Sequence, residues 1–448
     1  MIRTDSRKVR KGDIFVALPG ISSNGDQYIA KAIAAGAEKI ICKSGQYEVE
    51  TINTDDPRKY LEKLLAEEYG NIIDQMTLIA LTGTNGKTTT CYLIAQALNA
   101  LEQKCAYIGT IGFYLGEKVR DLPNTSVDIC DLYALLLEAY ENGYYSVALE
   151  ASSQGLDLGR LNTLSFDIAA FTNLTEDHLD YHKTMENYAL AKQKLFRQIK
   201  PGGCALINAD DEFKHYFLLE ENKNITYGLT NGDYRALSYS FGNGTELEFQ
   251  HEDKTYRSHI SLIGQYNIYN VMAVVSVLHI LGYDLSKIEK VIECLNAPDG
   301  RCDVIRYKEN NIVIDYAHTP DAVQKIMNTA KGFTTNKTYV VFGCTGDRER
   351  EKRPVMTQLV LKNCDYAIIT DDDVHTESEQ QIVADMLEGN LQENYEICLD
   401  RKEAIRKGIN LLHEGDTLLI LGKGHENFIV MNGYNIPHND RRAVLEYI

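Results

Sequence analysis

The chain has 448 residues, of which 44% are hydrophobic and 25% charged, and its formal net charge is −18. This length predicts about two to four domains, and the acidic balance argues against nucleic acid as a main partner, because that polymer is bound by basic surfaces. No stretch approaches the roughly 18 apolar residues that cross a membrane, and no apolar run follows the basic start MIRTDSRKVRKGD. We therefore expect a cytoplasmic protein without a signal peptide or membrane partner.

The first segment, up to about residue 70, predicts a compact α/β unit. It contains the short strands DIFVALPG and EKIIC around one helix, QYIAKAIAAGA. Ten cysteines are scattered along the whole chain without a CxxC pair, which argues against a zinc site and a disulfide framework. We interpret them as reduced and mostly buried thiols.

A glycine-rich segment, TGTNGKTTT, lies between the apolar strand MTLIAL and the helical pattern CYLIAQALNA. Backbone N–H groups around Gly83 and Gly86 can face an anion at the helix N-terminus. Lys87 would then reach the outer phosphates of a nucleotide and Thr88 would bind Mg²⁺. The alternative is a solvated turn that happens to contain Gly-Lys, but strand, loop and helix in register favour a phosphate loop.

Strands and helices alternate from about residue 75 to 297, which predicts a mainly parallel sheet with crossover helices. Ligands of such sheets lie at the carboxyl ends of the strands. One strand ends in Glu150, and another is followed by Asn173, Asp177 and His178. We expect these ends to meet at the phosphate loop, where a carboxylate and an imidazole can serve Mg²⁺. Taken alone, His178 is more often a structural hydrogen-bonding residue.

Two later patterns are ambiguous by themselves. The helix ENYALAKQKLF places Lys192 and Lys194 on different faces, and lysines on helices are usually solvated. In GQYNIYN, Asn267 and Asn270 lie one helical turn apart and could read a base edge with their amides.

A second α/β series follows NAPDGR, with the strands NIVIDYAH, TYVVFGC, YAIITDD, YEICLD and DTLLILGKG. If this sheet is parallel, TDDDVHTE and GKGHE lie along one rim, together with GCTGDRER. The resulting pocket would suit a zwitterionic ligand, with Arg348 binding a carboxylate and the acidic residues binding ammonium groups. The alternative is that these are ordinary charged loop residues.

Taken in order, about ten motifs over nearly the whole chain resemble those of the Mur ligases: TGTNGKTTT, ALEASSQGLDLGR, FTNLTEDHLDYH, YALAKQKLF, LIGQYNIYN, DGR, IDYAHTPDA, FGCTGDRE, KRP and LGKGHE. With TDSRKVRKGDIFVALPG, the set is most similar to the tripeptide synthetases of that family, which add the third residue to UDP-MurNAc-L-Ala-D-Glu in peptidoglycan synthesis. The resemblance implies a monomeric α/β protein of three domains: a UDP-sugar domain at 1–72, a central P-loop ATPase at 73–297 and a Rossmann-like amino-acid domain at 298–448.

The resemblance also implies residue roles. The implied catalytic residues are Lys87, Lys192, His178 and Glu150. ATP would be bound by Gly83, Thr84, Asn85, Gly86, Lys87, Thr88, Thr89, Asn267, Asn270, Arg301 and Asp315. Mg²⁺ would be bound by Thr88, Glu150, His178 and Lys192, the last as a carbamylated lysine whose anionic oxygens reach the metal. The UDP-dipeptide would contact Thr4, Ser6, Ser22, Asn124, Thr125, Ser126, Ser152 and Arg160, and the incoming amino acid Arg348, Asp372, Asp373, His375, Gly422 and Glu426.

The string DDVH at Asp372 to His375 departs from the DNPR that the resemblance implies for members selective for meso-diaminopimelate. A mostly neutral histidine cannot supply the guanidinium fork that grips a distal carboxylate, and Asp373 adds negative charge. The sequence therefore favours a diamino acid without a second carboxylate, lysine before ornithine, and meso-diaminopimelate is the alternative.

The implied reaction begins when ATP phosphorylates the D-glutamyl carboxylate, and an amine then attacks the acyl phosphate. The alternatives are a Mur-like ligase of a specialised pathway, a ligase similar to folylpolyglutamate synthase, and a nucleotide-binding regulator that has lost the chemistry.

Overall fold

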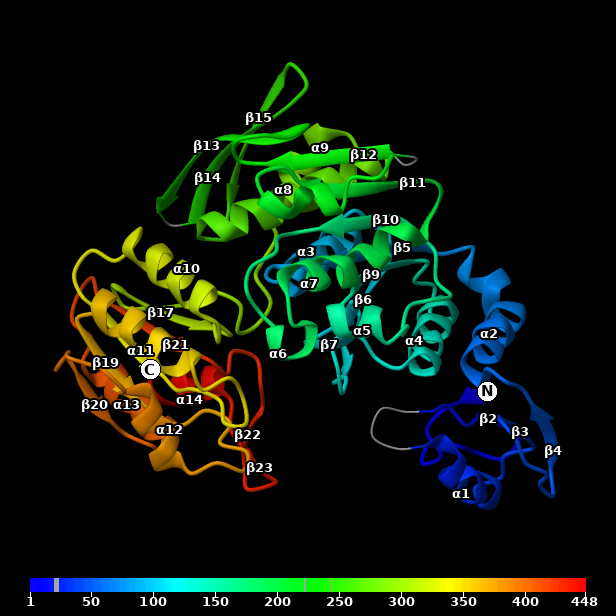
Figure 1. Ribbon diagram of the computed structural model, residues 1–448. Coiled ribbons are helices and arrows are strands. Elements are labelled where there is room, and N and C mark those ends of the chain that lie inside the picture. The colour runs from blue at the N-terminus through cyan, green and yellow to red at the C-terminus, as the bar shows by residue number, and fades with distance from the viewer. Residues whose placement is uncertain (20–23, 221–222, 243) are drawn as a thin grey trace.

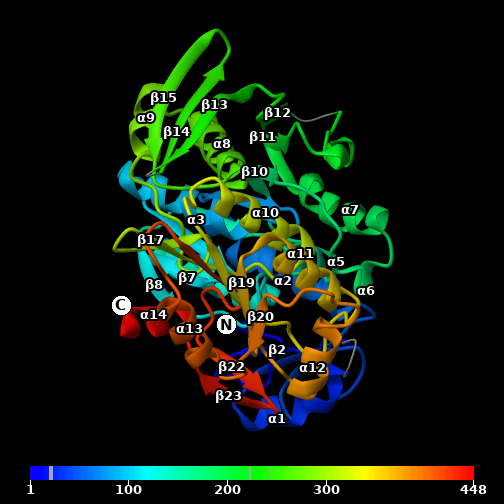
Figure 2. The same ribbon diagram turned by 90° about the vertical axis from the view of Figure 1, so that its left-hand side faces the viewer.

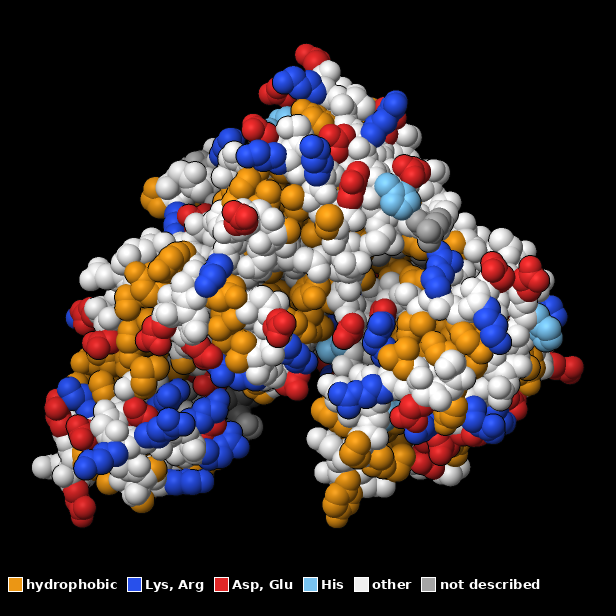
Figure 3. Space-filling view, turned by 180° about the vertical axis from the view of Figure 1, so that it is seen from behind, with side chains coloured by type: hydrophobic (Ala, Val, Ile, Leu, Met, Phe, Trp, Pro, Cys, Tyr) orange, Lys and Arg blue, Asp and Glu red, His pale blue; other side chains and the backbone are white. Residues whose placement is uncertain are grey.

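The computed structural model describes residues 1–19, 24–220, 223–242 and 244–448. Within these residues the strands form sheets of four, eleven, six and two strands. Figure 1 shows three lobes, with the central one joining an N-terminal and a C-terminal lobe, and Figure 3 shows an open notch between these two. None of the described helices is both long and apolar enough to span a membrane.

The N-terminal sheet is parallel and has the order β1-β2-β3-β4. Its strands are β1 (Ile2–Arg3), β2 (Ile14–Val16), β3 (Lys39–Cys42) and β4 (Glu50–Asn53). One face packs on α1 (Ile29–Ala34), which follows the 3₁₀ turn η1 (Gly25–Tyr28), and the other shares its core with the central lobe. A second helix, α2 (Pro57–Ile73), begins at an Asp56 cap and a first-position proline. The prediction of one helix in this segment is therefore wrong.

The central sheet has the order β15-β14-β13-β12-β11-β10-β5-β9-β6-β7-β8. The strands from β13 to β6 pair in parallel, as the alternating pattern predicted, and antiparallel strands extend both ends. The strands are β5 (Thr77–Thr82), β6 (Cys105–Gly109), β7 (Gly112–Leu115), β8 (Glu117–Arg120), β9 (Ser146–Glu150), β10 (Phe166–Phe171), β11 (Ile199–Asn208), β12 (Lys223–Gly228), β13 (Tyr234–Gly242), β14 (Gly244–His251) and β15 (Lys254–Ile260).

Helices cover both faces of the central sheet, because its parallel strands are apolar on both sides. One face packs on α2 with α4 (Ile129–Glu141), α5 (Ser153–Asp157) and α7 (Met185–Gln193). The other packs on α3 (Lys87–Ala100), α8 (Gln265–Ile280) and α9 (Leu285–Ile292). The shorter elements are α6 (Leu179–His182), η2 (Lys194–Gln198) and η3 (Glu212–Tyr216).

The C-terminal sheet has the order β16-β17-β21-β18-β19-β20 and is parallel except for β16. Helices α10, α11 and α12 cover one face, and α13 and α14 the other (Figure 2). The elements are β16 (Asp303–Tyr307), β17 (Asn310–Asp315), α10 (Pro320–Lys331), β18 (Thr338–Phe342), α11 (Lys352–Asn363), β19 (Tyr366–Ile369), α12 (Glu379–Met386), β20 (Tyr395–Ile397), α13 (Arg401–Asn410), β21 (Thr417–Leu421) and α14 (Asp440–Tyr447).

A separate hairpin, β22 (Phe428–Met431) with β23 (Tyr434–Pro437), follows β21. The parallel pairing of β17, β21, β18 and β19 places their carboxyl ends on one rim, as the sequence predicted. The cysteines are free thiols, and most of them are buried.

Candidate active site

The loop between β5 and α3 has the backbone of a phosphate loop. Gly83 and Gly86 adopt φ values of 148° and 86°, where side chains are strained. A Cβ at Gly83 would lie 1.9 Å from Oγ1 of Thr172. The ammonium of Lys87 lies over the same loop and donates to the carbonyls of Gly83 and Thr84 at 2.8 and 2.9 Å. Burial lowers the pKa of Lys87, although Glu150 and Asp177 oppose this.

Glu150, at the end of β9, connects the phosphate-loop helix with the loop after β6. Its carboxylate accepts hydrogen bonds from the Thr88 hydroxyl at 2.9 Å and from the backbone N–H and hydroxyl of Thr110 at 2.9 and 3.1 Å. The Tyr107 hydroxyl donates to it as well. The buried carboxylate is therefore held by several donors beside the residue predicted to bind Mg²⁺.

Lys192 is buried, with 1% of its surface exposed, whereas Lys194 is exposed and pairs with Asp157 at 2.6 Å. The Lys192 ammonium donates to the carbonyl of Gly83 at 2.7 Å and lies 4.3 Å from the ring centre of Tyr188. Burial, and then the neighbouring Lys87, hold the pKa of Lys192 well below its ordinary value. A neutral amine at this position can react as a nucleophile.

His178 precedes α6 with a left-handed φ of 55°, and its Nε2 lies 3.5 Å from Oδ2 of Asp177. Partial burial lowers the pKa of His178, against the effect of Asp177. Asp177 also lies 3.5 Å from Nζ of Lys352 on α11, so this edge of the site reaches the C-terminal lobe. The phosphate loop also contacts the C-terminal lobe, because the Asn85 amide donates to the carboxylate of Asp321 on α10 at 2.8 Å.

The residues predicted for the nucleoside side form two groups. Asn267 and Asn270 are buried on α8, bonded to each other at 2.9 Å, and Oδ1 of Asn270 accepts from the Thr90 hydroxyl at 3.1 Å. The Arg301 guanidinium stacks 4.3 Å from the ring centre of Tyr316. Burial raises the pKa of the adjacent Asp315, and Arg301 opposes this.

A polar strip leads from Glu150 towards the N-terminal lobe. The hydroxyls of Thr125 and Thr110 are 3.0 Å apart, and the Ser126 hydroxyl donates to the Glu150 carbonyl at 3.0 Å. Further along, the backbone N–H of Ser152 donates to the Ser126 hydroxyl and the Arg160 guanidinium to the Ser126 carbonyl.

Three other residues predicted for the UDP-dipeptide belong to the described part of the chain. The hydroxyl of Thr4 donates to Asp128 at 2.8 Å, which joins the N-terminal lobe to the cap of α4. Ser6 is buried, Asn124 is exposed, and Ser22 lies outside the described residues.

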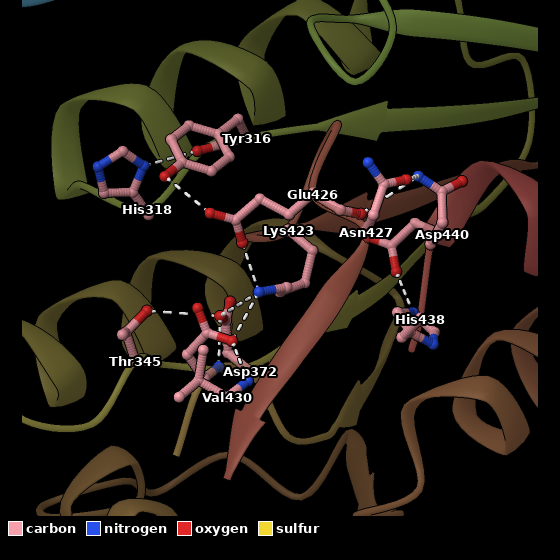
Figure 4. A network of polar contacts seen from close by, with 12 residues as sticks. Tyr316, His318, Thr345, Asp372, Lys423, Glu426, Asn427, Val430, His438 and Asp440 are labelled. Carbon is pink, nitrogen blue, oxygen red and sulfur yellow. Dashed lines mark hydrogen bonds and ion pairs between the residues drawn. The ribbon is translucent and has the colours of Figure 1, made fainter. Parts of the chain in front are cut away.

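The rim of the C-terminal sheet holds a lysine surrounded by carboxylates (Figure 4). Lys423 has no exposed side-chain surface, and its Nζ lies 2.7 Å from Asp373, 3.9 Å from Asp372 and in contact with Glu426. A Cβ at Gly422 would lie 2.3 Å from the Asp372 carboxylate, so glycine is required there. The sequence predicted that Asp373 adds negative charge here, and in the structure Lys423 pairs with this carboxylate.

The structure does not bring Arg348 into this cluster. Arg348 is exposed and has no ion pair or hydrogen bond within the described ranges. A different arginine, Arg353, is buried and binds Glu377 and Asp385 at 2.6 and 2.8 Å. His375 contacts the β22–β23 hairpin through its backbone, whose N–H and carbonyl both form hydrogen bonds with the hairpin.

Sequence reasoning missed several supporting residues. Tyr107 and Thr110 hold Glu150, Tyr188 lies against Lys192, and Lys423 organises the acidic cluster. Thr110 directly follows a strand of the parallel sheet and Lys423 stands inside GKGHE, so both positions carried a signal. No residue pattern pointed to the two tyrosines.

Family profiles match three parts of the chain. The Mur ligase family catalytic domain matches residues 1–69, the Mur ligase middle domain residues 81–278, and the Mur ligase glutamate ligase domain residues 300–424. The chain belongs to the Mur ligase family. The family assignment made from the sequence motifs is therefore confirmed, as are the α/β fold and its class as a ligase.

Individual Mur ligases are similar to this chain over almost their whole length. A UDP-N-acetylmuramoyl-L-alanyl-D-glutamate–2,6-diaminopimelate ligase of Aquifex aeolicus is 37% identical, over 100% of this chain and 93% of its own. One of Clostridium acetobutylicum, ligase 1, is 34% identical over 99% and 93%. A solved structure of a ligase with the same name has a TM-score of 0.71 at 34% identity, covering 100% of this chain and 94% of that one.

Proposed function

We propose that this Mur ligase joins a diamino acid to the D-glutamyl carboxylate of UDP-MurNAc-L-Ala-D-Glu at the expense of ATP. The observation that carries the proposal is the position of Glu150. Its carboxylate binds Thr88 of the phosphate loop on one side and Thr110, which contacts the Thr125–Ser126 strip, on the other. One side chain thus connects the region suited to a triphosphate with the region suited to a carboxylate acceptor.

The residues present fit Mg²⁺. The described residues contain no cluster of three or more His, Cys, Asp or Glu side chains that would hold a metal. Mg²⁺ commonly takes one or two carboxylates and completes its shell with water and substrate phosphates. Thr88 and Glu150 would hold it, with His178 and a carbamylated Lys192 nearby. The bound ion would offset the charge of the transferring phosphoryl group.

The chain itself contributes positioning and charge. The ammonium of Lys87, now bonded to loop carbonyls, can turn to the outer phosphates, while the N–H groups at the start of α3 hold the others. The Ser126, Ser152 and Arg160 strip orients the acceptor so that its carboxylate faces the phosphate loop. Because phosphoryl transfer needs alignment and charge stabilisation, a covalent protein nucleophile is not required.

The acidic cluster at Lys423 suits the amine of the second substrate. This cluster can bind an ammonium, because its three carboxylates, Asp372, Asp373 and Glu426, share only one lysine, Lys423. The names of the similar ligases favour 2,6-diaminopimelate as the added amino acid. Lysine is the second candidate, because His375 cannot replace an arginine in binding a distal carboxylate.

The three larger sheets, one in each lobe, and the matched profiles support the domain division at 1–72, 73–297 and 298–448. We propose a UDP-sugar site in the first domain, ATP binding in the second and amino-acid binding in the third. Use of ATP as a substrate supports a cytoplasmic location. The monomeric state stays a prediction that light scattering would test.

The test is ATP hydrolysis and ligation measured with UDP-MurNAc-L-Ala-D-Glu and a panel of amino acids. We expect hydrolysis only when both the UDP-dipeptide and a diamino acid are present. A higher kcat/KM for lysine than for meso-diaminopimelate would select the second candidate. Ligation to folate glutamates, or no ligation with any diamino acid, would contradict the proposal and indicate a ligase of another pathway.

A further inference from the structure

The carboxylate of Asp373 joins three segments of the C-terminal lobe. Its Oδ1 accepts hydrogen bonds from Nζ of Lys423 and from the backbone N–H of Val430, each at 2.7 Å. Asp373 follows β19, Lys423 follows β21 and Val430 lies on β22 (Lys423 and Val430 in Figure 4). Only 13% of the Asp373 side chain is exposed, so water competes little for these bonds.

The β22–β23 hairpin lies against the loop that contains Asp373. The backbone N–H of His375 donates to Val430 at 3.0 Å, and that of Asn432 donates to His375 at 2.8 Å. The hairpin strands pair with each other as a separate two-stranded sheet. These backbone bonds and the Asp373 carboxylate are its polar anchors, beside the packing of Met431 on the core of the lobe.

Lys423 transmits the position of Asp373 to the residues proposed to bind the amino acid. It contacts the Glu426 carboxylate and lies 3.9 Å from Asp372, and its carbonyl accepts from the Glu426 backbone at 3.0 Å. Burial lowers the pKa of Lys423, but Asp372, Glu426 and Asp373 together raise it above the ordinary value, so the group is an ammonium. Without Asp373, this ammonium would pair only with Asp372 and Glu426.

We propose that Asp373 is a positioning residue, which anchors Lys423 and the β22–β23 hairpin and so fixes where Lys423 holds Asp372 and Glu426 for the amine of the substrate. Asp373 does not itself touch the substrate in this arrangement. The effect on the amino acid rests on the proposed function, whereas the anchoring of the hairpin does not.

Two substitutions separate the roles of the Asp373 carboxylate. Asp373→Asn keeps an oxygen that can accept from Val430 but removes the ion pair with Lys423, and Asp373→Ala removes both. Glu414→Gln, an exposed position in the turn before β21, is the matched loss of one carboxylate in the same lobe. The measurements are amide hydrogen exchange over residues 428–437 and steady-state kinetics for each substrate.

We expect Asp373→Ala to speed exchange of the hairpin about tenfold or more and Asp373→Asn less than about threefold, since asparagine keeps an acceptor for the Val430 N–H and alanine does not. Both should raise the KM for the amino acid about tenfold, while kcat and the KM for ATP change less than about twofold. Glu414→Gln should match the wild type in every measurement.

Wild-type exchange of the hairpin in Asp373→Ala would overturn the anchoring role. An unchanged KM for the amino acid in both variants would overturn the positioning role. If Asp373→Ala does not fold, the KM of Asp373→Asn for the amino acid decides whether the positioning role holds. If the wild-type enzyme ligates no amino acid, the proposed function fails, and the exchange measurement still decides whether Asp373 anchors the hairpin.

Discussion

Replacing Lys192 by methionine or alanine should separate its cost to stability from its value for activity. Lys192 is buried beside a second lysine, and its ammonium bonds only the Gly83 carbonyl among the described residues. Such a position destabilises a charged amine but suits a carbamate, which forms from the neutral amine and is anionic. We therefore expect Lys192→Met to lose ligation without losing the fold.

The magnitudes follow from the environment of Lys192. Its pKa in the folded protein is lowered from the ordinary value of 10.5, so the unfolded chain binds a proton that the folded one does not. The free energy of unfolding should rise with pH between the two pKa values, and each unit of difference corresponds to about 1.4 kcal/mol. Lys192→Met removes this slope and loses about 1 kcal/mol from the hydrogen bond to Gly83. Loss of the anionic group should lower kcat about 10²- to 10³-fold.

The assay combines urea unfolding from pH 7 to 10 with turnover in bicarbonate-free and bicarbonate-supplemented buffer. Lys192→Ala leaves space, so added short-chain carboxylates should partly restore its activity. Lys194→Ala is the matched control and should change turnover and stability only slightly, because Lys194 is an exposed partner of Asp157. Near-normal turnover of Lys192→Ala without bicarbonate would refute the carbamate assignment, and equal pH slopes for Lys192→Met and wild type would refute the buried-amine argument.

Two further predictions concern the metal and the C-terminal core. Glu150→Gln and His178→Ala should raise the Mg²⁺ concentration needed for half-maximal activity while circular dichroism stays unchanged, and an unchanged requirement in both would exclude them as ligands. Arg401 and Asp440 form a fully buried pair at 2.7 Å, so Arg401→Ala should lower the free energy of unfolding by about 3–5 kcal/mol. Arg401 keeps the pKa of Asp440 below its ordinary value despite burial. The contribution of the pair to the free energy of unfolding should therefore be present above about pH 4 and lost as pH falls further. An acid-unfolding curve of Asp440→Asn identical to that of the wild type would contradict this.

The central site was largely predictable because its residues follow consecutive strands. Glu150 and His178 stand after buried apolar runs, and a parallel sheet brings such positions to one edge. The glycines at positions 83 and 86 carried their own conformational signal. The helix α2 was missed although its sequence, PRKYLEKLLAEEYGNII, has apolar residues at helical spacing, with Leu61 and Leu65 buried one turn apart.

The acidic cluster was less predictable, because its pairs join distant segments. Asp373 and Lys423 are 50 residues apart, and the loops that contain them follow strands separated by β18 in the sheet. From the sequence alone, three adjacent aspartates indicate free negative charge, whereas the structure shows that Asp373 is paired. The prediction for the amino acid depended on that charge and on His375, and the ion pair with Lys423 weakens the first of these two supports.

The joint between the central and C-terminal lobes determines how the amine site faces the phosphate loop. The polar contacts across it, Asn85 with Asp321 and Lys352 with Asp177, are partly exposed, and such pairs contribute about 0–1 kcal/mol each. A firmer constraint lies at Gly300, where φ is 68° and an added Cβ would lie 2.2 Å from the backbone of the GKGHE segment. Close packing at this one glycine therefore fixes the start of the C-terminal lobe against its own GKGHE segment, while the weak polar contacts leave the lobes able to separate.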